Sequence, residues 1–97
     1  MNKVIIRSDR AGVFFGELKS QSQCGDKLMV EMINCRRVFY WSGAASLSQL
    51  AVEGSKRQNE CKITMPVDSI VVLGVIEIIP MTEEAVQNLD NIKAWKI

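Results

Sequence analysis

The run that most restricts the fold lies towards the C-terminal end, where residues 69–79 read S-I-V-V-L-G-V-I-E-I-I. A segment this rich in valine and isoleucine is typical of a β-strand. Pro80 ends the run, because proline cannot donate a hydrogen bond to a neighbouring strand. Gly74 lies in its middle, and a glycine there indicates a bulge, a sharp bend or close approach of another backbone. The run therefore predicts a long strand with one of these three irregularities at Gly74.

Shorter apolar segments predict the remaining strands, which are 3–7, 13–18, 27–33, 36–41 and 61–65. Turn residues between the first two predict a hairpin. The segment 27–33 is apolar on both faces, which indicates a central strand or one at an interface. Asn34 and Cys35 follow it as a bulge or tight turn. The polar stretches 19–26 and 55–60 are expected to be loops, the second one mobile and without a hydrophobic anchor.

Two short helices are predicted. The first runs from an N-cap at Ser42 to Gly54 at the position after its C-terminus, with Leu47 and Leu50 on its apolar face. The second begins after Thr82 and carries acidic residues in its first turn, which favours the helix dipole. Trp95 is expected to pack back on the body. We therefore expect an α+β fold: a bent antiparallel sheet or small β-barrel with one short central helix and a C-terminal helix, in a single domain of residues 1–97.

The composition narrows the classes of function. The chain has 97 residues, 47% of them apolar and 24% charged, which is typical of a folded domain. Its 12 basic and 11 acidic residues give a net charge of +1. A general nucleic-acid-binding protein would show a basic excess, so none is expected here. Any binding of anions must be local.

Histidine is absent from the sequence, so the zinc sites that use histidine as a ligand are not possible. The common Ser-His and Cys-His catalytic pairs are absent for the same reason, because they use histidine as the base. We expect no metal, no cofactor and no catalytic residue. The three cysteines, Cys24, Cys35 and Cys61, are interpreted as reduced thiols of a cytoplasmic protein. Cys35 adjoins two arginines that could lower its pKa, or it is a small buried strand residue. No signal peptide or membrane span is expected, because the longest apolar stretch is only 70–76.

The segment 35–54 carries the strongest candidate site, because two arginines and an aromatic cluster precede a Ser-Gly turn into a helix. Free amides at a helix start form a cradle for anions, an arginine matches phosphate geometry, and an aromatic ring can stack on a base. The candidate ligand-binding residues here are Arg36, Arg37, Tyr40, Trp41, Ser42, Gly43 and Ser46. Arg36 and Arg37 lie on opposite faces of a strand, so at most one should point at the turn. The alternative is an ordinary helix cap beside core aromatic residues.

Arg7 and Arg10 flank the first turn and form a second basic group. They could complete the ligand pocket, even from a neighbouring subunit. The alternative is a solvated hairpin loop whose charges pair locally with Asp9.

Three segments carry a resemblance to a known family. They are V-I-I-R-S-D-R-A-G-V-F-F-G-E-L, R-R-V-F-Y-W-S-G-A-A-S-L-S-Q-L-A-V-E-G and V-I-E-I-I-P-M-T-E-E-A. In them the chain resembles a family of small bacteriophage and prophage proteins, which share R-x-x-x-A-G-V-x-F-G, R-R-x-x-x-W-x-G-A-x-S-L and E-I-I-P. The resemblance covers nearly the whole chain and implies a phage setting, without implying an activity.

These observations lead to one main hypothesis. The chain would be a non-enzymatic homo-oligomer that captures a phosphate-bearing, nucleotide-like ligand and so blunts host signalling. The apolar segments 27–33 and 69–79 motivate the oligomer, because they exceed what one small sheet buries. Two other hypotheses stay open: a virion structural or assembly module, and a direct inhibitor of a host protein.

Overall fold

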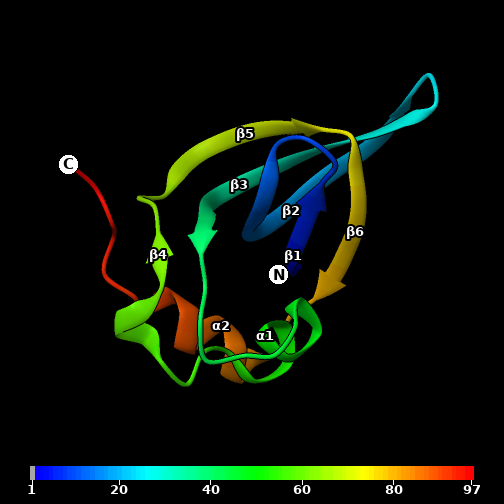
Figure 1. Ribbon diagram of the computed structural model, residues 1–97. Coiled ribbons are helices and arrows are strands. Elements are labelled where there is room, and N and C mark those ends of the chain that lie inside the picture. The colour runs from blue at the N-terminus through cyan, green and yellow to red at the C-terminus, as the bar shows by residue number, and fades with distance from the viewer. Residues whose placement is uncertain (1) are drawn as a thin grey trace.

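The computed structural model describes residues 2–97, and in it six strands and two α-helices form an α+β fold (Figure 1). The strands are β1 (Lys3–Ser8), β2 (Gly12–Cys24), β3 (Lys27–Tyr40), β4 (Lys62–Ile63), β5 (Val67–Leu73) and β6 (Val75–Pro80). The helices are α1 (Leu47–Glu53), the 3-10 helix η1 (Gln58–Glu60) and α2 (Glu83–Asp90). The expected α+β class is confirmed.

All strand pairs are antiparallel, in the order β4-β3-β2-β1-β6, and β5 pairs with the other half of β3. β5 and β6 are joined by Gly74 alone, whose φ of 70° is in the left-handed region. Of the three alternatives for Gly74, the structure shows the bend. One bent strand lies along β3 at one edge of the sheet and along β1 at the other (Figure 1). The sheet formed by the described residues is bent but not closed into a barrel.

The predicted loop at 19–26 is wrong, because β2 continues to Cys24 and only Gly25 and Asp26 form a turn. The end of β2 and the start of β3 make a two-stranded arm that projects from the body (Figure 1). Residues 20–27 of this arm are exposed on both sides. The alternation of polar and apolar residues that identifies a half-buried strand is therefore missing there.

β3 is a single strand where the sequence predicted two. Asn34 has a φ of 49°, and the pairing with β2 gains one residue on β3 at this point, which is a β-bulge. Gly16 lies opposite the bulge, where a Cβ atom would be only 2.9 Å from the Cα of Cys35. The bulge alternative is therefore correct, and the tight turn is not formed.

Two apolar clusters lie on the two sides of the sheet. The first lies inside the bend and contains Val4, Ile6, Phe14, Val30, Met32, Cys35, Val72 and Val75. The second lies under the helices and contains Ile5, Phe15, Val38, Leu50, Ala51, Ile63, Leu89 and Ile92. Because β1 faces both clusters alternately, its three central residues are all buried. The helices therefore cover the face of the sheet that carries the second cluster. The face that carries the first cluster lies inside the bend and is open to solvent at its edge.

Candidate functional site

The Ser42–Ser46 turn does not begin a helix. α1 begins at Leu47, and the Oγ of Ser46 accepts a hydrogen bond from the N–H of Gln49 at 3.1 Å. The predicted cap at Ser42 is therefore wrong. The predicted role of Gly54 is confirmed, since its N–H donates to the carbonyl of Leu50 at 2.9 Å with a φ of 76°.

Gly43 explains why the chain turns without starting a helix. Its φ is 80°, and a Cβ atom there would lie 2.4 Å from the backbone nitrogen of Arg57. The turn therefore packs directly against the segment 55–57, where the Oγ of Ser55 donates to the carbonyl of Ser42. Ser55 is only 2% exposed, so the loop 55–60 has a polar anchor that the sequence did not predict.

Several polar groups of this turn already have partners within the chain. The hydroxyl of Ser42 donates to the carboxylate of Glu60 at 3.2 Å. The N–H of Ala45 donates to the side-chain oxygen of Gln49 at 2.8 Å. An anion at this turn would displace these bonds and meet the negative charge of Glu60. The turn is therefore a weak candidate for an anion cradle.

Arg36 is buried, with 7% of its surface exposed, and connects three parts of the fold. Its guanidinium donates to the carbonyls of Thr64 at 2.8 Å, Ile92 at 2.9 Å and Leu89 at 3.2 Å. Burial lowers the pKa of Arg36, and the nearby charge of Asp90 acts in the opposite direction. These bonds hold the segment after β4 and the end of α2 against β3.

Arg37 points to the other side of β3, as the alternation of a strand requires. Its guanidinium carbon lies 4.7 Å from the centre of the Phe14 ring, and its side chain is exposed to solvent. The structure therefore separates the two arginines that adjoin in sequence. Only Arg37 is available to a ligand or a partner.

The aromatic candidates do not join this arginine. Tyr40 lies at the end of β3 opposite Lys62 and is 53% exposed. Trp41 packs against the cluster under the helices. Trp95 does pack back on the body as expected, because its ring stacks on Phe39 with centres 5.0 Å apart. Arg10 borders two hollows on the open side of the sheet, and neither Tyr40 nor Trp41 lines them.

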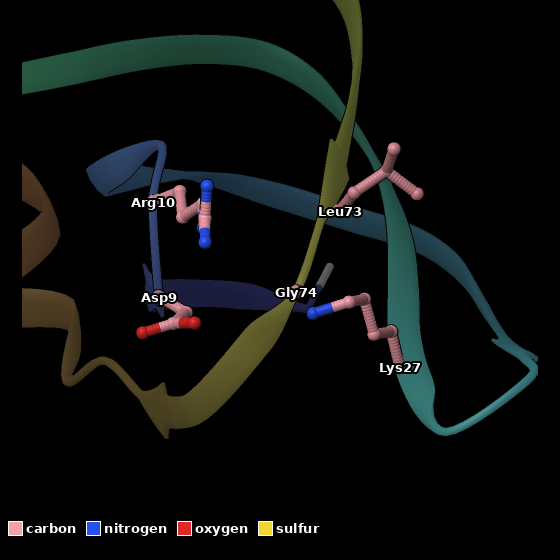
Figure 2. A pocket seen from close by; sticks show the side chains of 5 residues that line it. All are labelled: Asp9, Arg10, Lys27, Leu73 and Gly74. Atoms are coloured by element: carbon pink, nitrogen blue, oxygen red, sulfur yellow. The ribbon is translucent and has the colours of Figure 1, made fainter.

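Arg10 lies between two adjoining hollows on the open side of the sheet. The first, which we name the Gly74 hollow, has a volume of about 360 Å³ and is lined by Asp9, Arg10, Lys27, Leu73 and Gly74. The second, the Phe14 hollow, has a volume of about 380 Å³ and is lined by Arg10, Ala11, Phe14, Arg37, Ile70, Val71, Val72 and Leu73. Figure 2 shows Arg10 and Lys27 approaching the bend at Gly74 from opposite sides.

Hydrogen bonds fix the β1–β2 turn that carries Arg10. The hydroxyl of Ser8 donates to the carbonyl of Leu73 at 2.6 Å and accepts from the N–H of Ala11 at 3.2 Å. The N–H of Asp9 donates to the carbonyl of Gly74 at 2.9 Å. The turn is thus attached to the β5–β6 bend, and Lys27 enters from the first residue of β3.

The charges in the Gly74 hollow are two cations and the single carboxylate of Asp9. Over residues 2–97, neither Arg10 nor Lys27 forms an ion pair. Arg7 does not join them, because it lies on β1 and its Nε is 3.4 Å from the carboxylate of Glu77. Arg10 is one of the candidates named from the sequence, and Lys27 is not. In the sequence, the only sign that Lys27 could belong to a site was its position directly after a Gly-Asp turn.

Of the two interpretations of Cys35, a reactive thiol or a small buried strand residue, the structure supports the second. It is 1% exposed, and burial raises the pKa of its thiol to about 11, although Arg37 acts in the opposite direction. The thiol is therefore protonated at neutral pH and is a poor nucleophile. The part of the chain that the structure describes holds no cluster of three side chains suited to a metal ion.

The comparisons with known proteins yield one family. The family described as "Domain of unknown function (DUF6948)" matches residues 1–89. No curated protein matches the chain, and no solved structure does. Within residues 2–97, neither helix has the length and apolar character needed to cross a membrane.

Proposed function

The chain belongs to the DUF6948 family, and we propose that it is a binding protein for a phosphate-bearing, nucleotide-like ligand held in the Gly74 hollow. Arg10 and Lys27 contact the phosphate groups from opposite sides. Leu73 supplies an apolar wall for the remainder of the ligand. This places the ligand at the first turn of the chain and away from the Ser42–Ser46 turn.

One observation carries the proposal: Arg10 in the β1–β2 turn and Lys27 at the start of β3 face one hollow, and neither forms an ion pair among the described residues. Unpaired cations that face each other repel, so their arrangement is stabilised when an anion lies between them. The guanidinium of Arg10 can hold two phosphate oxygens at once, and the lysine adds a point charge. The volume of about 360 Å³ is within the range of small-molecule sites.

Binding without turnover is the chemistry that the residues support. The hollow contains one carboxylate, Asp9, and the sequence has no histidine to act as a general base. In the phage setting that the sequence resemblance implies, the captured ligand would be a nucleotide second messenger of the host. Sequestration would then blunt host signalling in the cytoplasm.

Isothermal titration calorimetry tests the proposal with a panel of cyclic di- and trinucleotides, ADP-ribose and inorganic pyrophosphate. We expect at least one of these to bind. Arg10→Ala and Lys27→Ala should each weaken that binding by at least about tenfold, since a charged hydrogen bond contributes roughly 1.5–3 kcal/mol. Affinity should also fall as the salt concentration rises.

Lys93→Ala is the matched control, because it removes one positive charge outside the hollow and should change affinity by less than about twofold. Two results would contradict the proposal. One is the absence of heat with every member of the panel. The other is binding that Arg10→Ala and Lys27→Ala leave unchanged, which would place the ligand elsewhere on the chain.

A further inference from the structure

β5 has one free edge. Over the described residues it pairs only with β3, from Cys35 opposite Val67 to Met29 opposite Leu73. No strand of residues 2–97 pairs with the other edge of β5, although the side chains of β5 are mostly apolar. Natural sheets protect such edges with charges, prolines or bulges, because an unpaired edge is a template for another strand.

The accessible part of this edge is short and well defined. Pro66 precedes β5 and cannot donate a backbone hydrogen bond, which sets one end. At the other end, the hydroxyl of Ser8 occupies the carbonyl of Leu73 at 2.6 Å. The free segment is therefore 67–71, with the sequence V-D-S-I-V. Its outer face presents Val67 and Val71, which are 42% and 55% exposed.

We propose that two copies of the chain associate through this edge, with their β5 strands antiparallel and Ser69 on the twofold axis. This register places Val67 opposite Val71 of the partner subunit on the outer face, so both exposed valines become paired. Ser69 faces Ser69 of the partner subunit across the axis, and its hydroxyl donates to the carboxylate of Glu31 in its own chain at 3.3 Å. The two three-stranded segments β2-β3-β5 then form one continuous sheet.

Charge complementarity selects this register. Asp68 is the only charged residue of the segment, and the register places it opposite Ile70 of the partner subunit. Ile70 lines the same hollows as Arg37. Arg37 is exposed and, over residues 2–97, forms no ion pair within its own chain. Each subunit therefore supplies Asp68 to the other subunit's Arg37, twice around the axis.

The interface is self-complementary, so it closes with two copies and leaves no free edge at 67–71. In this interface Arg37 contacts the partner subunit. The association does not depend on a ligand at Arg10 and Lys27. Because only five residues of each strand pair, the interface is small and the expected dissociation constant is about 1–100 µM.

Sedimentation equilibrium and a cysteine cross-link test the proposal together. At a protein concentration of about 200 µM, above the expected range of the dissociation constant, most of the protein should have twice the mass of the 10.9 kDa chain. Ser69→Cys, in a Cys24→Ser background that removes the exposed native thiol, should form an intermolecular disulfide under mild oxidation. Ile76→Cys is the matched control, because Ile76 is 60% exposed on β6 and lies outside the interface.

A charge exchange tests the register. Asp68→Arg and Arg37→Asp should each weaken association by about tenfold or more, since each places like charges opposite one another. The double variant should restore association to within about threefold of the original. A monomer at about 200 µM would overturn the proposal. A dimer whose Ser69→Cys form does not cross-link faster than the Ile76→Cys form, or whose charge exchange does not rescue association, would overturn it as well.

Discussion

Replacement of Arg36 by alanine distinguishes a structural arginine from a ligand-binding one. Two of its hydrogen bonds to carbonyls are short, at 2.8 and 2.9 Å, and a third is 3.2 Å long. A hydrogen bond to a charged group contributes about 1.5–3 kcal/mol. The carbonyls that lose their donor regain water only in part, because Arg36 is 7% exposed. We expect Arg36→Ala to lower the free energy of unfolding by about 3–5 kcal/mol.

Urea unfolding followed by tryptophan fluorescence measures this loss at one low protein concentration. Arg7→Ala is the matched control, because Arg7 forms a half-exposed ion pair with Glu77 and its removal should cost about 1 kcal/mol or less. If Arg36→Ala does not fold, Arg36→Lys replaces it, and its unfolding midpoint should lie clearly below that of Arg7→Ala. A loss from Arg36→Ala no larger than that from Arg7→Ala would refute the structural role.

Two further predictions concern single residues. Burial raises the pKa of the Cys35 thiol from about 9 to about 11, so its contribution to stability is intact below pH 9 and declines between about pH 9 and pH 11, by up to roughly 3 kcal/mol. Urea unfolding at several pH values should show this decline for the original chain and a smaller one for Cys35→Ala; equal slopes would contradict the assignment. Ser46→Ala should cost about 1 kcal/mol through loss of the cap, and Ser42→Ala less than about 0.5 kcal/mol. The reverse order in thermal denaturation would move the helix start to Ser42.

The strands with strong apolar patterns could be predicted from the sequence, and the polar arm could not. The strand prediction for the segment 69–79 is correct, because the strand preference of β-branched residues and the freedom of Gly74 to bend the chain are both local effects. In the arm, both faces of residues 20–27 are in solvent, so local composition resembles that of a loop. The helix start was predicted at Ser42, whereas Ser46 is the cap. Packing of Gly43 against the loop decided it.

The candidate site was harder to predict because its residues meet only in the folded chain. Arg36 and Arg37 look alike in sequence. The carbonyls that hold Arg36 belong to residues 63–92, and their convergence is a long-range property. Lys27 joins Arg10 only because the bend at Gly74 brings the first turn and the arm to one hollow. Residue type and spacing could therefore indicate arginine-rich turns without assigning each arginine its role.

The bend at Gly74 affects how the chain folds while it is being synthesised. β1, β2 and β3 are joined by short turns and can pair as soon as residue 40 has left the ribosome. Their two outer edges are completed only by β4, β5 and β6, the last of which ends at Pro80. At about 5–20 residues per second, the forty residues between take roughly 2–8 s. For that interval the nascent sheet has two open edges, and the growing chain is then most exposed to pairing with a wrong strand.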